Sequence, residues 1–250
     1  MELRISHFNW RKMPILRLDK IIASTGQYSR SGASALINSG RAAVDSRRAV
    51  SGAQKHDPGA VVITIDGRIL EYREYRYIML NKPAGYVSST NGKKDRTVME
   101  LLGPVYSKLG LFPAGRLDKD AEGLLLLTND GQLAHRIISP SGKIRKLYFV
   151  EFDGDITEDD INGFAGGLKL NDGTQCLPAV LEKVPNGAHV TICEGKYHQV
   201  KRMMAAIGKH VTYLKRLSIG GLLLDAGLET GSYKELGDGV MAVFTGKRGV

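Results

Sequence analysis

The sequence has very little cysteine and no long apolar run, and both absences restrict what the protein can be. Its 250 residues include two cysteines, Cys176 and Cys193, which cannot build the disulfide framework typical of small secreted domains. No run of about 18 apolar residues occurs, so the sequence predicts no transmembrane helix. The first residues lack the apolar core of a signal peptide. We therefore expect a cytoplasmic protein.

The usual signals of bound metals and nucleotides are also missing. The six histidines are scattered and never adjoin a cysteine at metal-ligand spacing. No G-x-G-x-x-G stretch follows an expected strand, and no Walker loop is present. We expect neither a metal site nor a nucleotide cofactor.

Positive charge, in contrast, is in excess and unevenly distributed. The formal net charge is +9, which favours a polyanionic partner. Residues 1–76 contain 13 lysines and arginines against 7 aspartates and glutamates, so most of the excess lies in under a third of the chain. The alternative, a solvated basic face without a ligand, stays open on charge alone.

This basic N-terminal part has the pattern of a small helical module followed by strands. A helical pattern begins at Ile15 and ends at Gly26, and the hydroxyl of Ser29 can cap a second helix. Residues 41–44 and 60–65 have the pattern of short strands. Two helices and then strands predict a compact unit of its own.

Several stretches of the module resemble the S4 RNA-binding domain over about residues 15–70. They are Arg17-Leu18-Asp19-Lys20, Ser29-Arg30, Ile37-Asn38-Ser39-Gly40-Arg41 and Asp57-Pro58-Gly59. The chain departs from that pattern at Asp45-Ser46, where an Asn-Gly turn is usual after the first strand. The resemblance implies RNA binding, and the basic residues that we expect to contact RNA are Arg17, Lys20, Arg30 and Arg41.

The rest of the chain alternates strands and helices in a way that predicts an α+β domain with a mainly antiparallel mixed sheet. Strands are expected at residues 77–80, 124–127, 146–150, 178–183 and 189–193, the last two paired as neighbours. Helices are expected at residues 97–102, from residue 132, from Thr157 to Gly166, and from about residue 199 to Gly208. In the last of these, Met203 and Met204 fall on the apolar face, where core packing is the expected role.

The stretch around Asp118 is the most informative part of this domain. Gly115 permits backbone geometry that a Cβ would penalise, and the loop after it can hold Asp118 at the edge of a cleft with Arg116 two residues away. By local pattern alone, a surface turn with solvated charges is an equally good interpretation.

Three stretches in unbroken order resemble the pseudouridine synthases of the RsuA group, which act on small-subunit ribosomal RNA. They are residues 77–87 (YIMLNKPAGYV), residues 114–132 (from AGRLD to TNDGQ) and residues 194–203 (EGKYHQVKRM). Together with the S4-like module, the resemblance extends from about Leu16 to Leu236. The sister group that acts on large-subunit RNA usually has an Asn-Arg-Glu-Val-Arg-Arg type of sequence at residues 197–202, which favours 16S over 23S RNA here.

The resemblance implies an isomerisation without a cofactor, in which the glycosidic bond of a uridine is cut and C5 is joined to C1′. Asp118 matches the catalytic aspartate of that group, and Tyr148 matches the tyrosine that stacks on the base. Without the resemblance, Tyr148 is more simply an ordinary strand aromatic.

The resemblance also implies roles for three cations. Lys201 matches the basic residue that pairs with the aspartate and keeps it ionised, and Arg202 can serve instead because helix phase is uncertain from sequence. Arg116 matches the arginine that fills the gap left by the flipped base. Without the resemblance, Lys201 and Arg202 would both be interpreted as part of a solvated helix face.

We therefore expect an RNA-modifying isomerase, monomeric, acting on 16S RNA that is free or in a partly assembled small subunit. Two other hypotheses stay open, a non-catalytic ribosome assembly factor and an RNA hydrolase or metal-dependent nuclease, although Asp118-Lys119-Asp120 is a poor metal cage. The expected domains are an extension at 1–14, the S4-like domain at 15–70, a linker at 71–76, the catalytic domain at 77–240 and a tail at 241–250.

Overall fold

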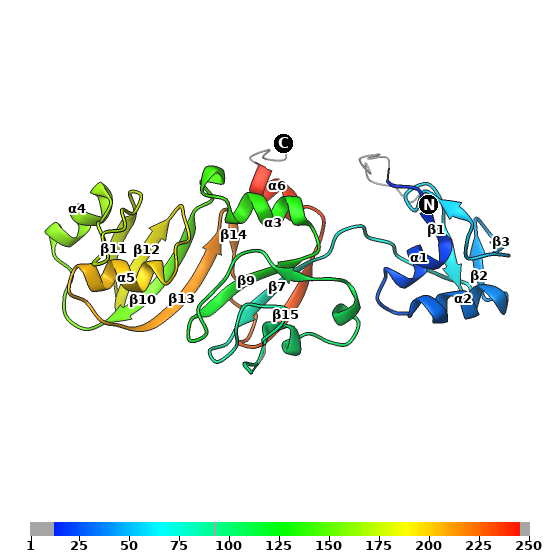
Figure 1. Cartoon of the computed structure of the whole chain (residues 1–250), viewed down its shortest axis with the longest axis horizontal. Helices are drawn as coiled ribbons and strands as arrows, with labels where there is room; N and C mark the ends of the chain where they lie inside the picture. The colour runs from blue at the N-terminus through cyan, green and yellow to red at the C-terminus, as the bar shows by residue number, and fades with distance from the viewer. Residues whose placement is uncertain (1–12, 93, 246–250) are drawn as a thin grey trace. The chain divides into compact units, whose positions relative to one another are not determined.

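The computed structural model describes residues 13–92 and 94–245, and the chain forms two compact units (Figure 1). The first unit extends to Glu74 and also includes Pro104–Leu109, and the second comprises Tyr75–Gly103 and the chain from Gly110 onward. The division falls inside the predicted linker, but no pattern in the sequence indicates that residues 104–109 belong with the first unit. Residues 1–12 of the predicted extension lie outside the described residues.

In its described residues, the first unit consists of two α-helices, one 3-10 helix and two small sheets. Its elements are β1 (Leu16–Arg17), α1 (Leu18–Ala23), α2 (Arg30–Asn38), β2 (Ala42–Val44), β3 (Arg47–Arg48), β4 (Lys55–His56), β5 (Ile63–Ile65), β6 (Arg68–Ile69) and the 3-10 helix η2 (Tyr106–Lys108). The larger sheet has the order β3-β2-β5-β6, and β1 pairs with β4. Leu18, Ile21 and Ile22 are fully buried in its core. Helix α1 begins later than predicted because Leu16 and Arg17 are used in the pairing with β4.

Local sequence explains how this unit turns. The hydroxyl of Ser29 accepts a hydrogen bond from the backbone N–H of Gly32 at 3.0 Å, which confirms the predicted cap of α2. Asp45 and Ser46, between β2 and β3, have φ of 47° and 65°, the left-handed values of a tight hairpin. The turn therefore forms without the Asn-Gly pair, and the carboxylate of Asp45 accepts the backbone N–H of Val62 at 2.9 Å to hold it.

The described part of the second unit is built on a nine-stranded sheet. Its strands are β7 (Tyr77–Lys82), β8 (Phe112–Pro113), β9 (Glu122–Thr128), β10 (Lys146–Phe152), β11 (Val180–Val184), β12 (Gly187–Ile192), β13 (Val211–Ile219), β14 (Leu222–Leu223) and β15 (Tyr233–Leu236). The order is β11-β12-β10-β13-β9-β7-β15, with β8 on β9 and β14 on β13. All of these pairs are antiparallel except β9 with β13. The predicted α+β class with a mainly antiparallel mixed sheet is confirmed.

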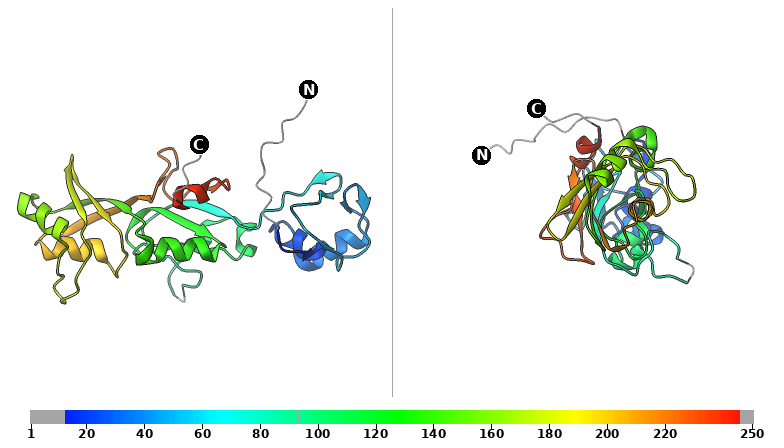
Figure 2. Two further views of the ribbon diagram at one scale, coloured as in Figure 1. Left: turned by 90° about the horizontal axis from the view of Figure 1, so that it is seen from above. Right: turned by 90° about the vertical axis from the view of Figure 1, so that its left-hand side faces the viewer.

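Four α-helices and two 3-10 helices accompany the sheet in the described part of this unit. They are η1 (Val98–Leu101), α3 (Gly131–Ile138), η3 (Pro140–Gly142), α4 (Glu158–Gly166), α5 (Gln199–Ala206) and α6 (Val240–Thr245). Figure 2 shows α3 (green) and α5 (gold) along one face of the sheet. Met203 and Met204 of α5 are fully buried, as their place on the apolar face predicts. Among the described residues, no helix is long and apolar enough to cross a membrane.

The end of this unit differs from the prediction of a tail at 241–250. Residues 240–245 form α6, in which Val240 and Phe244 are buried in a core with Leu133 and Ile137 of α3. Two apolar residues four positions apart place one face of a short helix on that core. Residues 246–250 lie outside the described part of the chain.

Candidate active site

Two glycines shape the loop that carries Asp118. Gly115 and Gly123 have φ of +99° and +97°, values that L side chains rarely adopt. A Cβ at Gly123 would lie 2.3 Å from the backbone oxygen of Arg216, its partner in the parallel register of β9 and β13. Only glycine therefore lets β9 approach β13 here, and the loop of residues 116–121 ends at that contact.

A buried lysine fixes the backbone of this loop. The side chain of Lys82, at the end of β7, is fully buried, and its Nζ donates to the carbonyl oxygens of Pro83, Lys119 and Ala121 at 2.9, 3.2 and 2.7 Å. Burial lowers the pKa of Lys82 to about 8, so the side chain is mostly protonated at neutral pH. A buried ammonium that is shared by three carbonyls holds the chain on the C-terminal side of Asp118.

The carboxylate of Asp118 accepts no hydrogen bond from the described residues. It is partly exposed, with 22% of its side-chain surface accessible, and the imidazole of His198 and the ammonium of Lys201 lie within 4 Å of it. Nε2 of His198 lies 3.5 Å from Oδ1, and Nζ of Lys201 lies 3.9 Å from Oδ2. These distances leave the carboxylate near positive charge but without a short bond to it.

Lys201 is bound more tightly to another aspartate. Its Nζ lies 2.6 Å from both carboxylate oxygens of Asp120, and this hydrogen bond lowers the pKa of Asp120. The predicted pair of Lys201 with Asp118 is therefore present only as a longer contact. The main partner of Lys201 is Asp120, a residue for which the sequence predicted no role.

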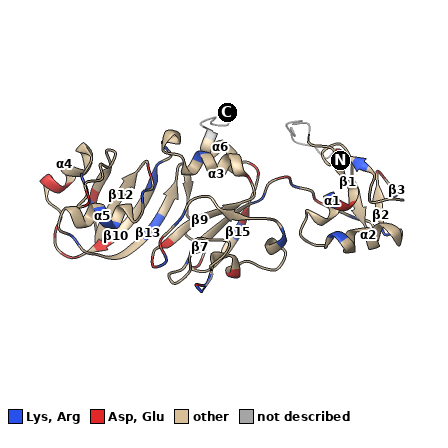
Figure 3. Cartoon of the chain, viewed as in Figure 1, with Lys and Arg blue, Asp and Glu red and all other residues tan. Residues whose placement is uncertain are grey.

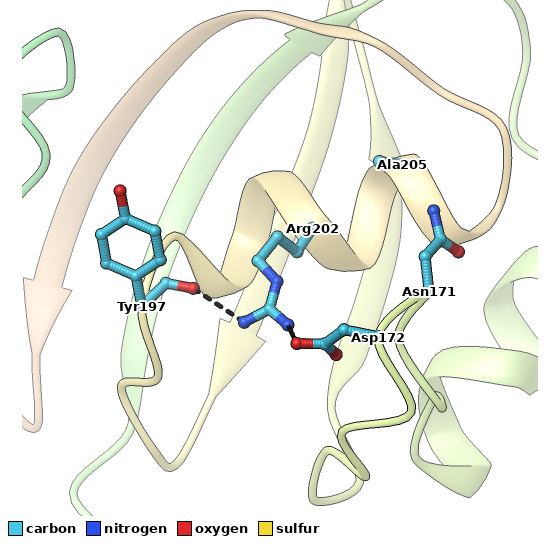
Figure 4. A pocket seen from close by; sticks show the side chains of 5 residues that line it. All are labelled: Asn171, Asp172, Tyr197, Arg202 and Ala205. Carbon is cyan, nitrogen blue, oxygen red and sulfur yellow. Dashed lines mark hydrogen bonds and ion pairs between the residues drawn. The ribbon is translucent and has the colours of Figure 1, made fainter.

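Arg202 takes a different partner, as Figure 4 shows. Its Nη2 donates to the carboxylate of Asp172, and its Nη1 donates to the backbone oxygen of Tyr197 at 3.2 Å. Between the two candidates that the sequence left open, Lys201 is the one near Asp118.

Tyr148 lies in β10 and is 7% exposed. The guanidinium of Arg216, in β13, faces its ring at 5.9 Å from the centroid, and Nη1 of Arg216 lies 3.4 Å from the phenol oxygen. The same Nη1 donates to the backbone oxygen of Arg116 at 3.4 Å, and Nε donates to Leu124 at 2.8 Å. Arg216 thus links the aromatic strand to the loop of Asp118.

Comparison with known proteins identifies the family of this chain. Residues 76–206 match the family model described as RNA pseudouridylate synthase. The chain belongs to the RNA pseudouridine synthase family. It is 43% identical to an uncharacterised RNA pseudouridine synthase of Bacillus subtilis, over 88% of this chain and 95% of that protein. It is also 43% identical to the ribosomal small subunit pseudouridine synthase A of Escherichia coli, over 88% of this chain and 96% of that protein.

A solved structure supports the same assignment. A crystal structure of a pseudouridylate synthase matches 92% of this chain and 100% of its own, with 36% identity and a TM-score of 0.64. Together these matches place the chain among RsuA-type pseudouridine synthases, as the sequence motifs indicate.

Within this pseudouridine synthase, the structure brings only some of the predicted residues together. Asp118, Tyr148, Lys201 and the backbone of Arg116 are joined through the contacts above, and the side chain of Arg116 is exposed. The other predicted RNA-contacting residues lie in the first unit. Arg17 donates to Asp19 and Arg41 to Asp66, each in a two-point contact, whereas Lys20 and Arg30 are exposed.

Sequence reasoning missed four residues of the site, Lys82, Asp120, His198 and Arg216. Lys82, Asp120 and His198 stand inside the matched stretches, so their position in those motifs was a usable signal. Arg216 lies in β13, a strand that the sequence analysis did not predict, and it follows the family match, which ends at residue 206. Lysines and arginines are spread along the ribbon of this unit (Figure 3), and no local sequence pattern distinguishes Arg216 from them.

Proposed function

We propose that this pseudouridine synthase converts one specific uridine of 16S ribosomal RNA to pseudouridine, with no cofactor and with Asp118 as the catalytic carboxylate. The observation that supports the role of Asp118 most directly is its carboxylate, which is partly buried, close to the imidazole of His198 and the ammonium of Lys201, and without a hydrogen bond from the described residues. A carboxylate that no donor binds keeps its lone pairs available for an electrophilic carbon.

In the reaction, the bond from N1 of uracil to C1′ breaks, and a bond from C5 to C1′ forms. The C5 proton is lost and a proton is gained at N1, so the product is an isomer of the substrate. Asp118 acts on the sugar, either as a nucleophile or by stabilising it after uracil leaves. Both routes use the carboxylate of Asp118 as an anion, and the ammonium of Lys201 lies 3.9 Å from it.

The neighbouring side chains have separable roles in this proposal. Tyr148 stacks on the flipped uracil, and stacking offsets part of the cost of removing the base from its own stack. Arg216 holds the tyrosine against the loop. Arg116, exposed beside Asp118, occupies the gap that the flipped base leaves, and Arg202 steadies the loop before α5.

The first unit serves as an S4-like docking module in this proposal. Its exposed cations, Lys20 and Arg30 among them, contact RNA phosphates, and Arg17 and Arg41 contribute less because a carboxylate already binds each of them. Removal of residues 1–70 is therefore expected to weaken RNA binding and to flatten its salt dependence, since fewer counterions are released. Unchanged affinity and salt slope would contradict this role. The two free cysteines fit a reducing cytoplasm, where we propose that the protein acts as a monomer.

The deciding experiment maps pseudouridines in ribosomal RNA from cells with and without the protein, and repeats the reaction with purified protein, 16S transcript and added chelator. Loss of one pseudouridine in 16S RNA, restored by the wild-type protein, is the expected result. Loss of a site in 23S RNA instead would move the substrate to the large subunit. An unchanged map would favour the non-catalytic assembly factor.

A further inference from the structure

An exposed aromatic pair stands directly beside Asp118. Tyr197 is 75% exposed, and its ring is stacked on that of His198, with centroids 3.8 Å apart and planes 18° apart. His198 in turn lies 3.5 Å from the carboxylate of Asp118. A large aromatic side chain that covers one neighbour and leaves its other surface to solvent is available to a ligand.

The backbone of this pair is held by its surroundings rather than free to adapt. His198 is a non-glycine residue at φ 48°, before the first residue of α5. The buried carboxylate of Glu194 accepts from Gln199 at 2.7 Å, and Gln199 accepts the backbone N–H of Lys196 at 2.8 Å. These bonds fix both ends of the turn, so the aromatic pair is presented in one arrangement before a ligand arrives.

A hollow lies next to Tyr197. It has a volume of about 370 Å³ and is lined by Asn171, Asp172, Tyr197, Arg202 and Ala205 (Figure 4). Figure 4 shows Arg202 between Tyr197 and Asp172, with its guanidinium bonded to both. An aromatic ring, a guanidinium, an amide and a carboxylate supply the stacking surface and the edge contacts that a nucleobase uses.

The surroundings add basic side chains that suit an anionic backbone, although Lys201 and Arg202 among them already bind a carboxylate each. A second hollow of about 300 Å³ lies along α5, and five of its seven lining residues are lysine, arginine or histidine. The lining residues are His198, Lys201, Arg202, Ala205, Lys209, His210 and Val211. A stacking ring beside such a groove is the combination with which proteins bind single-stranded nucleic acid.

We propose that Tyr197, backed by His198, is a stacking platform for an unpaired nucleobase of the substrate RNA, next to the uridine that is modified. This inference rests on the proposed function, in which Tyr148 receives the target base and Asp118 its sugar. The platform is joined to Asp118 through His198, so the base that stacks there is a neighbour of the target. A base within a duplex has no free face, so the platform takes single-stranded RNA.

The test uses single-stranded oligouridine of about ten nucleotides with one 2-aminopurine, whose fluorescence falls on stacking. Wild-type protein is expected to quench it, and Tyr197→Phe to retain the quench because the ring is kept. Tyr197→Ala is expected to lose the quench and to weaken binding about 5- to 100-fold. Leu223→Ala is the matched control, since Leu223 is an exposed apolar residue of the same unit at 66%. It is expected to behave as wild type.

The same variants are then assayed with 16S transcript, and the half-saturating RNA concentration is expected to rise in Tyr197→Ala. If Tyr197→Ala and wild type show the same fluorescence quench and the same half-saturating RNA concentration, the stacking platform is refuted. The proposed function still stands in that case, provided that wild type forms pseudouridine. Loss of the quench in Leu223→Ala as well would also overturn it, because the effect would not be specific to the ring. If neither wild type nor any variant forms pseudouridine, although the fluorescence quench depends on Tyr197, the proposed function is refuted instead.

Discussion

The tetrapeptide Arg-Leu-Asp-Lys occurs twice in the chain, and its two aspartates have opposite surroundings. In the first copy, Asp19 is 5% exposed, and Arg17 donates to it through Nε at 3.1 Å and Nη2 at 2.7 Å. In the second copy, Asp118 accepts no hydrogen bond from the described residues, and the basic groups nearest to it are the imidazole of His198 at 3.5 Å and the ammonium of Lys201 at 3.9 Å. The same tetrapeptide therefore contains a carboxylate that accepts two hydrogen bonds in one copy, and a carboxylate that accepts none from the described residues in the other.

The difference arises from the backbone that carries each copy. In the first, the N–H groups of Leu18 and Asp19 donate to the carbonyls of Gln54 and Gly52 at 2.8 and 3.1 Å, and α1 begins at Leu18. In the second, a left-handed glycine precedes the tetrapeptide, and the ammonium of Lys82 holds the carbonyls that follow Asp118. A carboxylate left without donors costs stability, which is the usual condition of a catalytic group.

The largest expected effect is on the second copy. Asp118→Asn is nearly isosteric and loses only charge and nucleophilicity, so we expect the variant to fold and bind RNA while single-turnover pseudouridine formation drops by more than about 10⁴-fold. Substantial turnover by this variant would refute the assignment of the nucleophile. The opposite outcome, loss of turnover with Asp19→Asn alone, would mean that the first copy is the catalytic one.

The next prediction tests whether Lys82 fixes the loop of residues 116–121, which carries Asp118. Lys82→Met leaves three buried carbonyls without their donor, so we expect the free energy of unfolding at pH 7 to fall by about 3 kcal/mol in denaturant titrations. The matched control is Lys20→Met in the first copy, where the side chain is exposed and a change within about 0.5 kcal/mol is expected. Equal stability of wild type and Lys82→Met would show that the loop does not need the lysine.

The pH dependence of the same pair gives a second check. The pKa of Lys82 is lowered to about 8 in the folded protein, below the ordinary value of 10.5, so between these pH values the unfolded chain binds more protons. The stability of wild type relative to Lys82→Met is therefore expected to increase from pH 8 to pH 10.5 and to be constant below about pH 7. A difference that narrows over that interval would contradict the lowered pKa.

A smaller effect is expected when each aspartate loses its cation. Lys201→Met removes the positive charge near Asp118 and is expected to lower turnover about 10- to 100-fold with little change in melting temperature. Arg17→Met is expected to do the reverse, lowering the melting temperature and leaving turnover intact. Rescue of turnover by Lys201→Arg would confirm that charge is what matters. Normal turnover by Lys201→Met would leave His198 as the group that supports Asp118.

Local sequence was sufficient for features that neighbouring residues determine. The cap of α2 by Ser29, the pairing of residues 178–183 with 189–193, and the buried face of α5 all depend on short-range patterns, and the structure has each of them. The α+β class follows from the same patterns. The motifs also located Asp118, Tyr148 and Lys201, although their roles remain proposals.

Features that depend on distant residues were not predictable from the same patterns. Lys201 lies 81 residues from Asp120, and only the folded chain decides that Asp120 rather than Asp118 is its closer partner. Arg216 reaches Tyr148 across two neighbouring strands, 68 residues apart in sequence. The burial of Phe244 likewise depends on its contacts with α3, which local sequence does not show. The sequence therefore predicted a tail where the structure has α6.

The smallest expected effect concerns the first copy. Asp19→Asn keeps an acceptor for Arg17 but loses the charge, and Arg17 is itself half-exposed, so solvent already weakens the pair. We expect the free energy of unfolding at pH 7 to fall by about 1 kcal/mol or less, with turnover unchanged.

The hydrogen bond from Arg17 lowers the pKa of Asp19, so the stabilisation that Asp19 contributes is present above the ordinary value of 3.8 and is lost as pH falls through the lowered value. The difference between wild type and Asp19→Asn should therefore be constant from pH 7 to about pH 5 and vanish in stronger acid. A difference in stability that instead grew in acid would show that the fold stabilises Asp19 as the neutral acid. The bond from Arg17 to the charged carboxylate would then not explain how Asp19 differs from Asp118.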